Sequence, residues 1–284
     1  MSLPAAADLA ELVRLPAVLS VPGDVLVGAA ASGQVREVRR TAGLVASSSC
    51  LYLAGMALND YADREVDAVE RPGRPIPSGR VTPRFALGLS AALTVGAGLL
   101  AVAADGPRAL AMVGPLAVAV WSYDLALKST SAGVAGMSAC RGLDVMVGSG
   151  GSPRALPAAA VVAAHTAVVT EVSRREVDGG DPSVGRRALA ATAVVTGAGA
   201  LLSRGRLAAL GLLGAYATVV GRAHADAARD PSPARLQRAV GAGILGLMPL
   251  EAGLLAGAGA LVPAAGVASL WPLARRAARK RAVT

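Results

Sequence analysis

Long apolar runs, separated by short polar intervals, repeat along almost the whole chain. Each run is rich in Ala, Val, Leu and Gly, and is close to the length of about 17–25 residues that crosses a hydrocarbon core about 30 Å thick. Helices of soluble proteins need a polar face, which these runs lack. Nine runs can be placed, at 15–33, 41–60, 84–104, 107–125, 130–149, 155–176, 187–203, 207–224 and 239–258.

The pattern predicts an all-α, polytopic membrane protein with about nine transmembrane helices, and residues 1–284 are expected to form one membrane domain. A further apolar stretch, 259–273, either extends the last span or turns back. The alternative is a soluble, Ala-rich helical protein. Only 17% of the residues are charged, against about 25% in an average soluble domain, which counts against that alternative.

The basic residues indicate an orientation. The chain has a net charge of +9, but no nucleic-acid-reading module is recognisable, so we expect no nucleic-acid partner. With the N-terminus in the cytoplasm, about twice as many Lys and Arg residues fall on the cytoplasmic side as on the other. The basic tail fits this orientation only if 259–273 turns back. The polar loops 59–84 and 171–187 then both face the cytoplasm.

The most charged interval in the body of the chain is "NDYADREVDAVERPGRPIPSGRVT", residues 59–82. On a helix, Asn59, Asp63 and Asp67 form an i, i+4, i+8 row, and Asp60 lies beside it. Clustered carboxylates repel one another unless a cation relieves the repulsion, and Mg²⁺ prefers such oxygen ligands. The interval therefore predicts a Mg²⁺ site, with a solvated helix end interleaved with Arg64 as the alternative.

A proline-rich loop follows the acids. Its prolines prevent a helix from continuing, and it is expected to bring Arg71, Arg74 and Arg80 close to the acidic face. Guanidinium groups bind phosphate oxygens in a forked geometry. Carboxylates, a hard cation and arginines together predict a diphosphate-binding site.

This interval resembles the first signature of the UbiA-type intramembrane prenyltransferases, N-D-x-x-D-x-x-x-D followed by R-P-x-R-P-I-P-S-G. The resemblance implies nine transmembrane helices around a central cavity that opens to the cytoplasmic side. It also implies that Mg²⁺, held by two Asp-rich motifs, binds a polyprenyl diphosphate whose tail lies in the cavity. An integral protein of a bacterial cytoplasmic membrane is expected, with its active site facing the cytoplasm.

Two further segments fit the resemblance. "YDLALK", residues 123–128, is similar to a family element in which Lys128 would contact the diphosphate and Tyr123 would line the site. Asp124 stands where Ser or Thr is common in the family. Aligned with the second motif, D-x-x-D-x-E-x-D, the set Glu171, Glu176 and Asp178 would hold a cation, and Arg174 and Arg175 would bind substrate. Arg174 replaces an Asp of that motif, so the second metal site departs from the family pattern.

Ionisable residues also occur inside the apolar runs. Arg141 and Asp144 share a helix face at i, i+3, and charges at membrane depth usually mark a functional cavity. They line a cavity or pair with each other. By the resemblance, Arg141 faces the cavity and Asp144 replaces an Asn. Glu251 either lines the cavity or pairs with Arg141.

The sequence therefore predicts Mg²⁺-dependent transfer of a prenyl group from a polyprenyl diphosphate to an unknown acceptor within the bilayer. An intramembrane terpene cyclase, which ionises the same substrate without a separate acceptor, is the runner-up, and a polar-lipid carrier is a third alternative. His165 is expected to be a core residue and His224 a solvated loop residue. The predicted catalytic residues are Asp60, Asp63, Asp67, Tyr123, Lys128, Arg141 and Asp144; the predicted substrate-binding residues are Asn59, Arg71, Arg74, Lys128, Glu171, Arg174 and Arg175; the predicted metal ligands are Asn59, Asp60, Asp63, Asp67, Glu171, Glu176 and Asp178.

Overall fold

The protein is all-helical, as predicted. The computed structural model describes residues 4–177 and 179–281, and these residues contain no strand. Short 3-10 turns precede α2, α6 and α8, and a π-helical turn, Tyr123–Leu127, extends α6. The helices are α1 (Ala6–Leu12), α2 (Pro22–Ala31), α3 (Val38–Ala62), α4 (Arg64–Glu70), α5 (Pro83–Asp105), α6 (Leu110–Ser122), α7 (Gly133–Ser149), α8 (Leu156–Ser173), α9 (Pro182–Leu202), α10 (Leu207–Arg229), α11 (Pro233–Gly257) and α12 (Leu261–Arg281).

Six stretches are long and apolar enough to cross a membrane. They are Val38–Ala62, Pro83–Asp105, Pro107–Leu127, Pro153–Ser173, Leu207–Arg229 and Pro233–Gly257. The other predicted spans are also helical but are shorter or more polar: Val18–Ala31 is a shorter apolar segment, α7 has 17 residues, and α9 carries Arg186 and Arg187 near its start. The count of nine spans stays a prediction.

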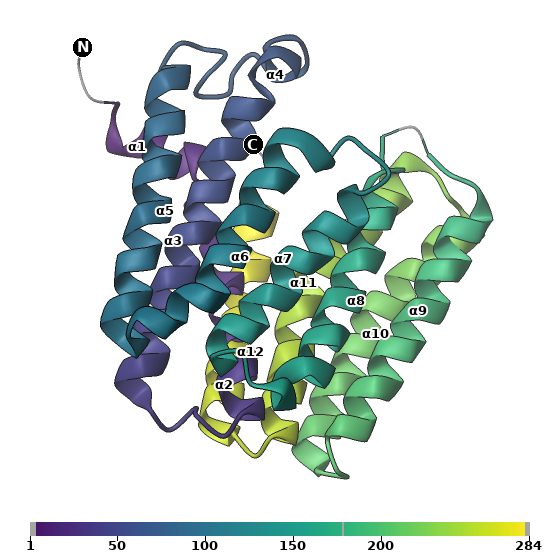
Figure 1. Ribbon diagram of the computed structural model, residues 1–284. Coiled ribbons are helices and arrows are strands. Elements are labelled where there is room, and N and C mark those ends of the chain that lie inside the picture. Colours follow the sequence, from purple (N-terminus) through teal and green to yellow (C-terminus); the bar gives the residue numbers. More distant parts are fainter. Residues whose placement is uncertain (1–3, 178, 282–284) are drawn as a thin grey trace.

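The long helices form a bundle in which neighbours in sequence pack side by side (Figure 1). The pairs α3–α5, α9–α10 and α10–α11 make the most extensive contacts, and α2 packs against α3, α7 and α11 near the centre. One end of the bundle carries α4 and the loops at 71–82, 128–132 and 174–181; we call it the acid-rich end. The opposite end carries the turns at 32–37, 150–153, 203–206 and 258–260.

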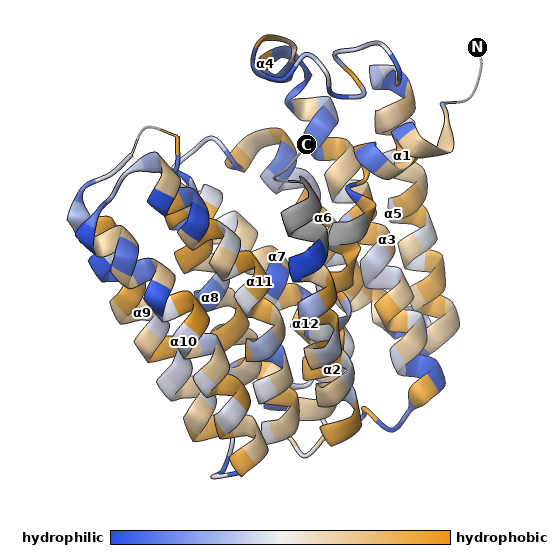
Figure 2. Cartoon of the chain, turned by 180° about the vertical axis from the view of Figure 1, so that it is seen from behind, coloured by the Kyte–Doolittle hydropathy of each residue, from blue (hydrophilic) through white to orange (hydrophobic). Residues whose placement is uncertain are grey.

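Hydropathy follows this division. Hydrophobic residues cover most of the length of the helices, and hydrophilic residues gather at the acid-rich end (Figure 2). Large apolar side chains on the outer helices, such as Val95, Val118 and Val194, are exposed. Such an outer surface fits contact with lipid chains, because an exposed aliphatic band is otherwise unfavourable.

Glycines allow α2 and α7 to approach closely. A Cβ added at Gly28 would lie 1.8 Å from the carbonyl oxygen of Val145, and one at Gly148 would lie 2.0 Å from that of Val25. Small residues at such crossings are typical of membrane helices. The close contact holds Asp24 of α2 beside the charged residues of α7.

Helix α12 settles the direction of the last apolar stretch. It packs against α11 and reaches the turn before α2, Leu15–Ser20, so it runs back toward the acid-rich end (Figure 1). The stretch 259–273 therefore turns back rather than extending the preceding span. This is the alternative under which the basic tail agrees with the N-in orientation.

Candidate active site

The predicted acidic row lies across a bend. Helix α3 ends at Ala62, and Asp63 connects it to the short helix α4, which runs in a different direction (Figure 1). The amide of Asp63 still donates to the carbonyl oxygen of Asn59 (2.9 Å), and the amide of Asp67 to that of Asp63 (2.8 Å). The three residues keep their helical spacing, but they do not share one straight helix face.

Arg74 links two of the acids. Its Nη1 lies 3.1 Å from Oδ1 of Asp60 and 2.8 Å from Oδ2 of Asp67. Arg14, which precedes α2, also reaches Asp60, with its Nη2 3.0 Å from Oδ1. Asp60 and Asp67 are both buried. Buried carboxylates require such partners, because an unpaired buried charge is costly.

Lys128 holds the third acid. Its Nζ lies 2.6 Å from Oδ1 of Asp63, and it follows the π-helical turn that ends α6. Nδ2 of Asn59 donates to Oδ1 of Asp124, 3.3 Å away. The structure thus brings "YDLALK" to the acids of α3, and π turns of this kind are frequent at functional sites.

The other two loop arginines lie farther from the acids. Nη1 of Arg71 is 3.8 Å from Asp67, and its side chain is mostly exposed. Arg80 was expected near the acidic face, and this was wrong. Its guanidinium pairs with Asp8 and Glu11 of α1, where these two acceptors raise its pKa. Arg80 therefore fastens α1 to the loop.

The second polar loop lies at the same end. Nη1 of Arg174 donates to the carbonyl oxygen of Thr130, 2.6 Å away. Partial burial raises the pKa of Glu176, and the nearby positive charge of Arg71 opposes this rise, so the two loops are neighbours. Arg175 is exposed, and Asp178 lies outside the described residues.

Glu171 lines a different cavity from Asp124 and Tyr123. That cavity, of about 360 Å³, lies between α7, α8 and α9 and also contains Arg187. In residues 4–177 and 179–281, no three His, Cys, Asp or Glu side chains lie close enough together to hold a metal ion. At the acid-rich end, Arg14, Arg74 and Lys128 occupy the carboxylates that a cation would need.

A cavity of about 120 Å³ extends from Asp124, the partner of Asn59, into the bundle between α3, α6 and α7. Tyr123 and Asp124 line it beside the acid-rich end, and Arg141 and Asp144 line it deeper in. Leu51, Leu116, Val120, Met56 and Met137 form most of its remaining wall. Its apolar wall and polar ends are suited to an amphipathic molecule.

The deep end of the cavity contains a charged cluster that sequence reasoning identified only in part. Nη1 of Arg141 lies 2.9 Å from Oδ2 of Asp24, and Nη2 lies 3.7 Å from Oε1 of Glu251. Asp144 instead accepts from the hydroxyl of Ser48, at 2.6 and 2.7 Å. Of the alternatives left open, Glu251 pairs with Arg141, and Arg141 pairs with α2 and α11 rather than with Asp144.

Asp24 and Arg14 were missed as site residues. Asp24 is fully buried, and the signal for it was available, since it is the only acid in the apolar run 15–33. Arg14 carried no such signal, because an arginine before a first span is also explained by the positive-inside rule.

The two histidines lie in the core. Nδ1 of His165 lies 3.0 Å from the hydroxyl of Tyr216, and its Nε2 lies 3.1 Å from the carbonyl oxygen of Gly243. His224 was expected in a solvated loop, but it is fully buried in α10 beside Thr192. The error arose because the apolar run 207–224 ends at His224, whereas α10 continues to Arg229.

Comparison with known proteins shows the family to which the chain belongs. Residues 24–282 match the UbiA prenyltransferase family. The chain belongs to that family. The resemblance read from residues 59–82 is therefore confirmed, and with the six apolar helices it makes this an integral membrane protein.

Relatives of known name are digeranylgeranylglyceryl phosphate synthases. That of Halobacterium salinarum is 35% identical over 187 residues, which cover 64% of this chain and 67% of the relative. That of Methanothrix thermoacetophila is 44% identical over 94 residues, 33% of this chain and 35% of the relative. That of Ignicoccus hospitalis is 40% identical over 120 residues, 42% of this chain and 39% of the relative. The chain thus spans little more than a third of the length of the latter two.

The fold is also that of a solved structure, described as "Structural and mechanistic insights into the biosynthesis of Digeranylgeranylglyceryl phosphate synthase in membranes". The match has a TM-score of 0.65 and covers 89% of this chain and 98% of that chain. With 16% sequence identity, the likeness establishes the UbiA-type fold of this chain and not its substrates.

Proposed function

We propose that this UbiA-family protein transfers a prenyl group from a polyprenyl diphosphate to an acceptor within the membrane. The observation that carries the proposal is the network of acids and cations at the acid-rich end, directly beside an apolar cavity. Asp60, Asp63 and Asp67 each have a basic partner there. A diphosphate with an isoprenoid tail has the matching chemistry, with charged oxygens at one end and a hydrocarbon chain at the other.

The acids have the donor chemistry that Mg²⁺ requires. Asn59, Asp60, Asp63 and Asp67 offer only oxygen ligands from their carboxylates and side-chain carbonyl, and hard cations prefer such ligands. A magnesium diphosphate would exchange partners within the network, with the carboxylates turning to the cation and Arg74 and Lys128 to the phosphate oxygens. Lys128 has capacity for this, because its buried Nζ has only the ion pair with Asp63 and makes no well-aligned hydrogen bond among the described residues. When bound, Mg²⁺ would polarise the diphosphate.

The chain's own residues would then promote ionisation. The allylic C–O bond breaks, and its electron pair leaves on the diphosphate. Arg74, Lys128 and, after a short rearrangement, Arg71 stabilise the growing negative charge. Groups that act where charge develops contribute about 10²–10³ in rate each. The acceptor's lone pair forms the new bond to carbon, and its proton passes to a nearby base or to water.

We propose that the second loop contributes cations rather than a second metal site. Arg174 and Arg175 lie beside the acid-rich end, whereas Glu171 lines the separate cavity. The negative charge of Glu176 attracts Arg71, and this attraction would help to bring Arg71 to the diphosphate. Arg174, which replaces an Asp of the family's second motif, would thus supply a positive charge instead of a metal ligand.

The names of the relatives suggest an acceptor to test first. They are synthases of digeranylgeranylglyceryl phosphate, a name that denotes two geranylgeranyl groups on glyceryl phosphate. We propose geranylgeranyl diphosphate as the first donor and geranylgeranylglyceryl phosphate as the first acceptor. The acid-rich end is proposed to face the cytoplasm, in agreement with the distribution of Lys and Arg.

The test is a pyrophosphate-release assay on purified protein, with C10 to C20 diphosphates, with and without the acceptor, in Mg²⁺ and in EDTA. We expect Mg²⁺-dependent release that requires the acceptor, and Asp63→Ala should lower it about 10²–10³-fold without unfolding the protein. Release to a hydrocarbon or alcohol without acceptor would establish the terpene cyclase instead. Binding without any pyrophosphate release would refute the proposal and favour the carrier, whereas near-normal activity of Asp63→Ala would refute the role given to the acids.

A further inference from the structure

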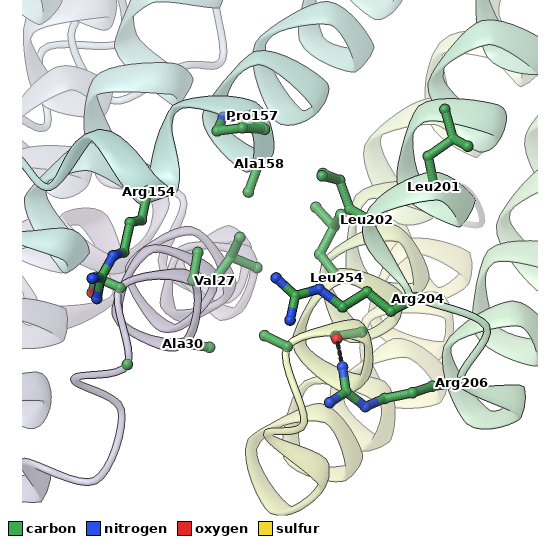
Figure 3. Close-up of a pocket in the computed structure, with 15 residues that line it drawn as sticks. Val27, Ala30, Arg154, Pro157, Ala158, Leu201, Leu202, Arg204, Arg206 and Leu254 are labelled. Carbon is green, nitrogen blue, oxygen red and sulfur yellow. Dashed lines mark hydrogen bonds between the residues drawn. The ribbon is translucent and has the colours of Figure 1, made fainter.

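A third cavity lies at the opposite end of the bundle, one membrane span away from the proposed active site. It has a volume of about 370 Å³ and lies where the ends of α2 and α11 meet the start of α8 and the α9–α10 turn. Arg154, Arg204 and Arg206 line it (Figure 3). We call it the basic pocket.

The basic pocket has an excess of positive charge. Arg206 donates to the carbonyl oxygen of Gly257, the last residue of α11. Among the described residues, the guanidinium groups of Arg154 and Arg204 make no hydrogen bond or ion pair, and no Asp or Glu lines the pocket. Figure 3 shows the guanidinium of Arg204 directed into the space between the helix ends, with Arg154 across from it. Guanidinium groups suit the oxygens of a phosphate.

The inner wall of the basic pocket is apolar. Val27, Leu202 and Leu254 line it beside the arginines. On the outside, Leu201 and Leu207 are 84% and 85% exposed, and they lie on either side of Arg204 in sequence. Exposed leucines at the end of membrane-spanning helices fit contact with lipid chains. The pocket therefore lies where lipid head groups meet the hydrocarbon region.

The prenyl diphosphate of the proposed active site does not explain these arginines. Helix α10 has 23 residues, which at 1.5 Å per residue separates the two ends by about 35 Å. Membrane topology does not explain them either. In the proposed orientation they lie on the non-cytoplasmic side, where basic residues are disfavoured.

We propose that the basic pocket binds the phosphate head group of an anionic membrane lipid, with the acyl chains lying along Leu201 and Leu207. The proposal does not rest on prenyl transfer. A bound lipid would bridge α8 and the α9–α10 turn, and so tie α9 and α10 to the rest of the bundle. Each arginine near an anionic lipid surface contributes about fivefold in affinity.

The test compares binding of phosphatidylglycerol and phosphatidylcholine to the purified full-length protein by native mass spectrometry. Wild-type protein should retain phosphatidylglycerol in preference to phosphatidylcholine. Arg154→Gln/Arg204→Gln should weaken phosphatidylglycerol binding about 25-fold. The matched control is Arg36→Gln/Arg39→Gln, which removes two exposed arginines from the same end and should change binding less than twofold.

Three results would overturn the proposal: equal retention of the two lipids, equal losses in the pocket variant and the control, or full competition by inorganic phosphate with no added affinity from the lipid. The last would assign the pocket to a soluble phosphate. Melting temperatures measured in phosphatidylcholine identify a misfolded variant. If Arg154→Gln/Arg204→Gln is misfolded, the single variants Arg154→Gln and Arg204→Gln give the same comparison, each with an expected loss of about fivefold.

Discussion

Single residues at the acid-rich end are arranged for an exchange of partners. Arg74 bridges Asp60 and Asp67, and Lys128 holds Asp63. In the ligand-free protein these contacts neutralise acids that would otherwise repel one another. In the proposed reaction the same cations would transfer to phosphate oxygens, and the acids would then become available to Mg²⁺.

Arg74→Lys tests this arrangement. A lysine carries one compact charge and lacks the planar, forked donors with which a guanidinium binds phosphate oxygens in pairs. We expect the rate of pyrophosphate release to fall about 10²-fold, with a higher Mg²⁺ requirement. Arg64→Lys is the matched control, since Arg64 pairs only with the exposed Glu65 among the described acids. Equal activity of the two variants would contradict the role given to Arg74.

The charged cluster deep in the cavity is expected to stabilise the folded protein. Arg141 is the basic partner of both Asp24 and Glu251. Removing one partner of a buried ion pair costs about 3–5 kcal/mol, because the remaining charge stays buried.

We therefore expect Arg141→Gln to lower the free energy of unfolding by about 3–5 kcal/mol, measured by thermal or denaturant unfolding in detergent. Arg141→Gln/Asp24→Asn should recover part of this loss, because it removes the orphaned carboxylate. No recovery in the double variant would show that the ion pair is not the reason for the loss.

At the scale of elements, helix α2 organises the interior. The apolar run 15–33 suggested one continuous span, but the structure has a 3-10 turn, Leu15–Ser20, and then α2 from Pro22. Proline at the first helical position favours this start. Helix α2 is thus short, and its close crossing with α7 determines where Asp24 meets Arg141.

Gly148→Leu tests the crossing. A Cβ at Gly148 would lie 2.0 Å from the carbonyl oxygen of Val25, so the backbones must separate. We expect a loss of about 1–3 kcal/mol or more in stability, together with reduced activity. Gly96→Leu is the control, because no atom lies within 4 Å of a Cβ at Gly96, and its melting temperature should stay within a few degrees of wild type. A similar loss of stability in both variants would show that any large side chain destabilises the bundle, and that the α2–α7 crossing is not the reason.

At the scale of the whole molecule, the return of α12 places both ends of the described chain near the acid-rich end. The orientation read from the basic residues then agrees with the basic tail. All proposed substrate-binding loops lie at this end, and the basic pocket lies at the other. The molecule therefore presents different chemistry to the two membrane surfaces.

Cysteine labelling in cells tests this topology. In a Cys50→Ser/Cys140→Ser background, Glu65→Cys and Arg276→Cys should react with a membrane-impermeant maleimide only after permeabilisation. Arg39→Cys should react in intact cells, because it lies at the opposite end. All three positions are exposed. Labelling of Arg276→Cys together with Arg39→Cys would show that α12 does not return, and labelling of Glu65→Cys in intact cells would reverse the orientation.

The sequence by itself determined the helical class, the membrane-spanning character and the first half of the site. Apolar runs report helix length directly, since the bilayer sets that length. Residues 59–82 carry much of their chemistry locally, because acids and arginines within a few turns of one another can meet, as Arg74 does with Asp60 and Asp67. For this reason the sequence could group Asp60, Asp63, Asp67 and Arg74, and a local motif could add Lys128; the structure brings these side chains together, and their roles stay predictions.

Only the tertiary structure decided which distant residues face one another. Arg141 has its partners on α2 and α11, Arg80 turns to α1, and Glu171 lines a cavity apart from the acids. The basic pocket likewise assembles residues from the ends of α2, α8, α9 and α11 and from the turn between α9 and α10. A sequence pattern gives the periodicity of one helix, whereas the pairing of buried charges depends on how helices far apart in the chain cross. Those crossings follow from side-chain packing, as at Gly28 and Gly148, which no local pattern contains.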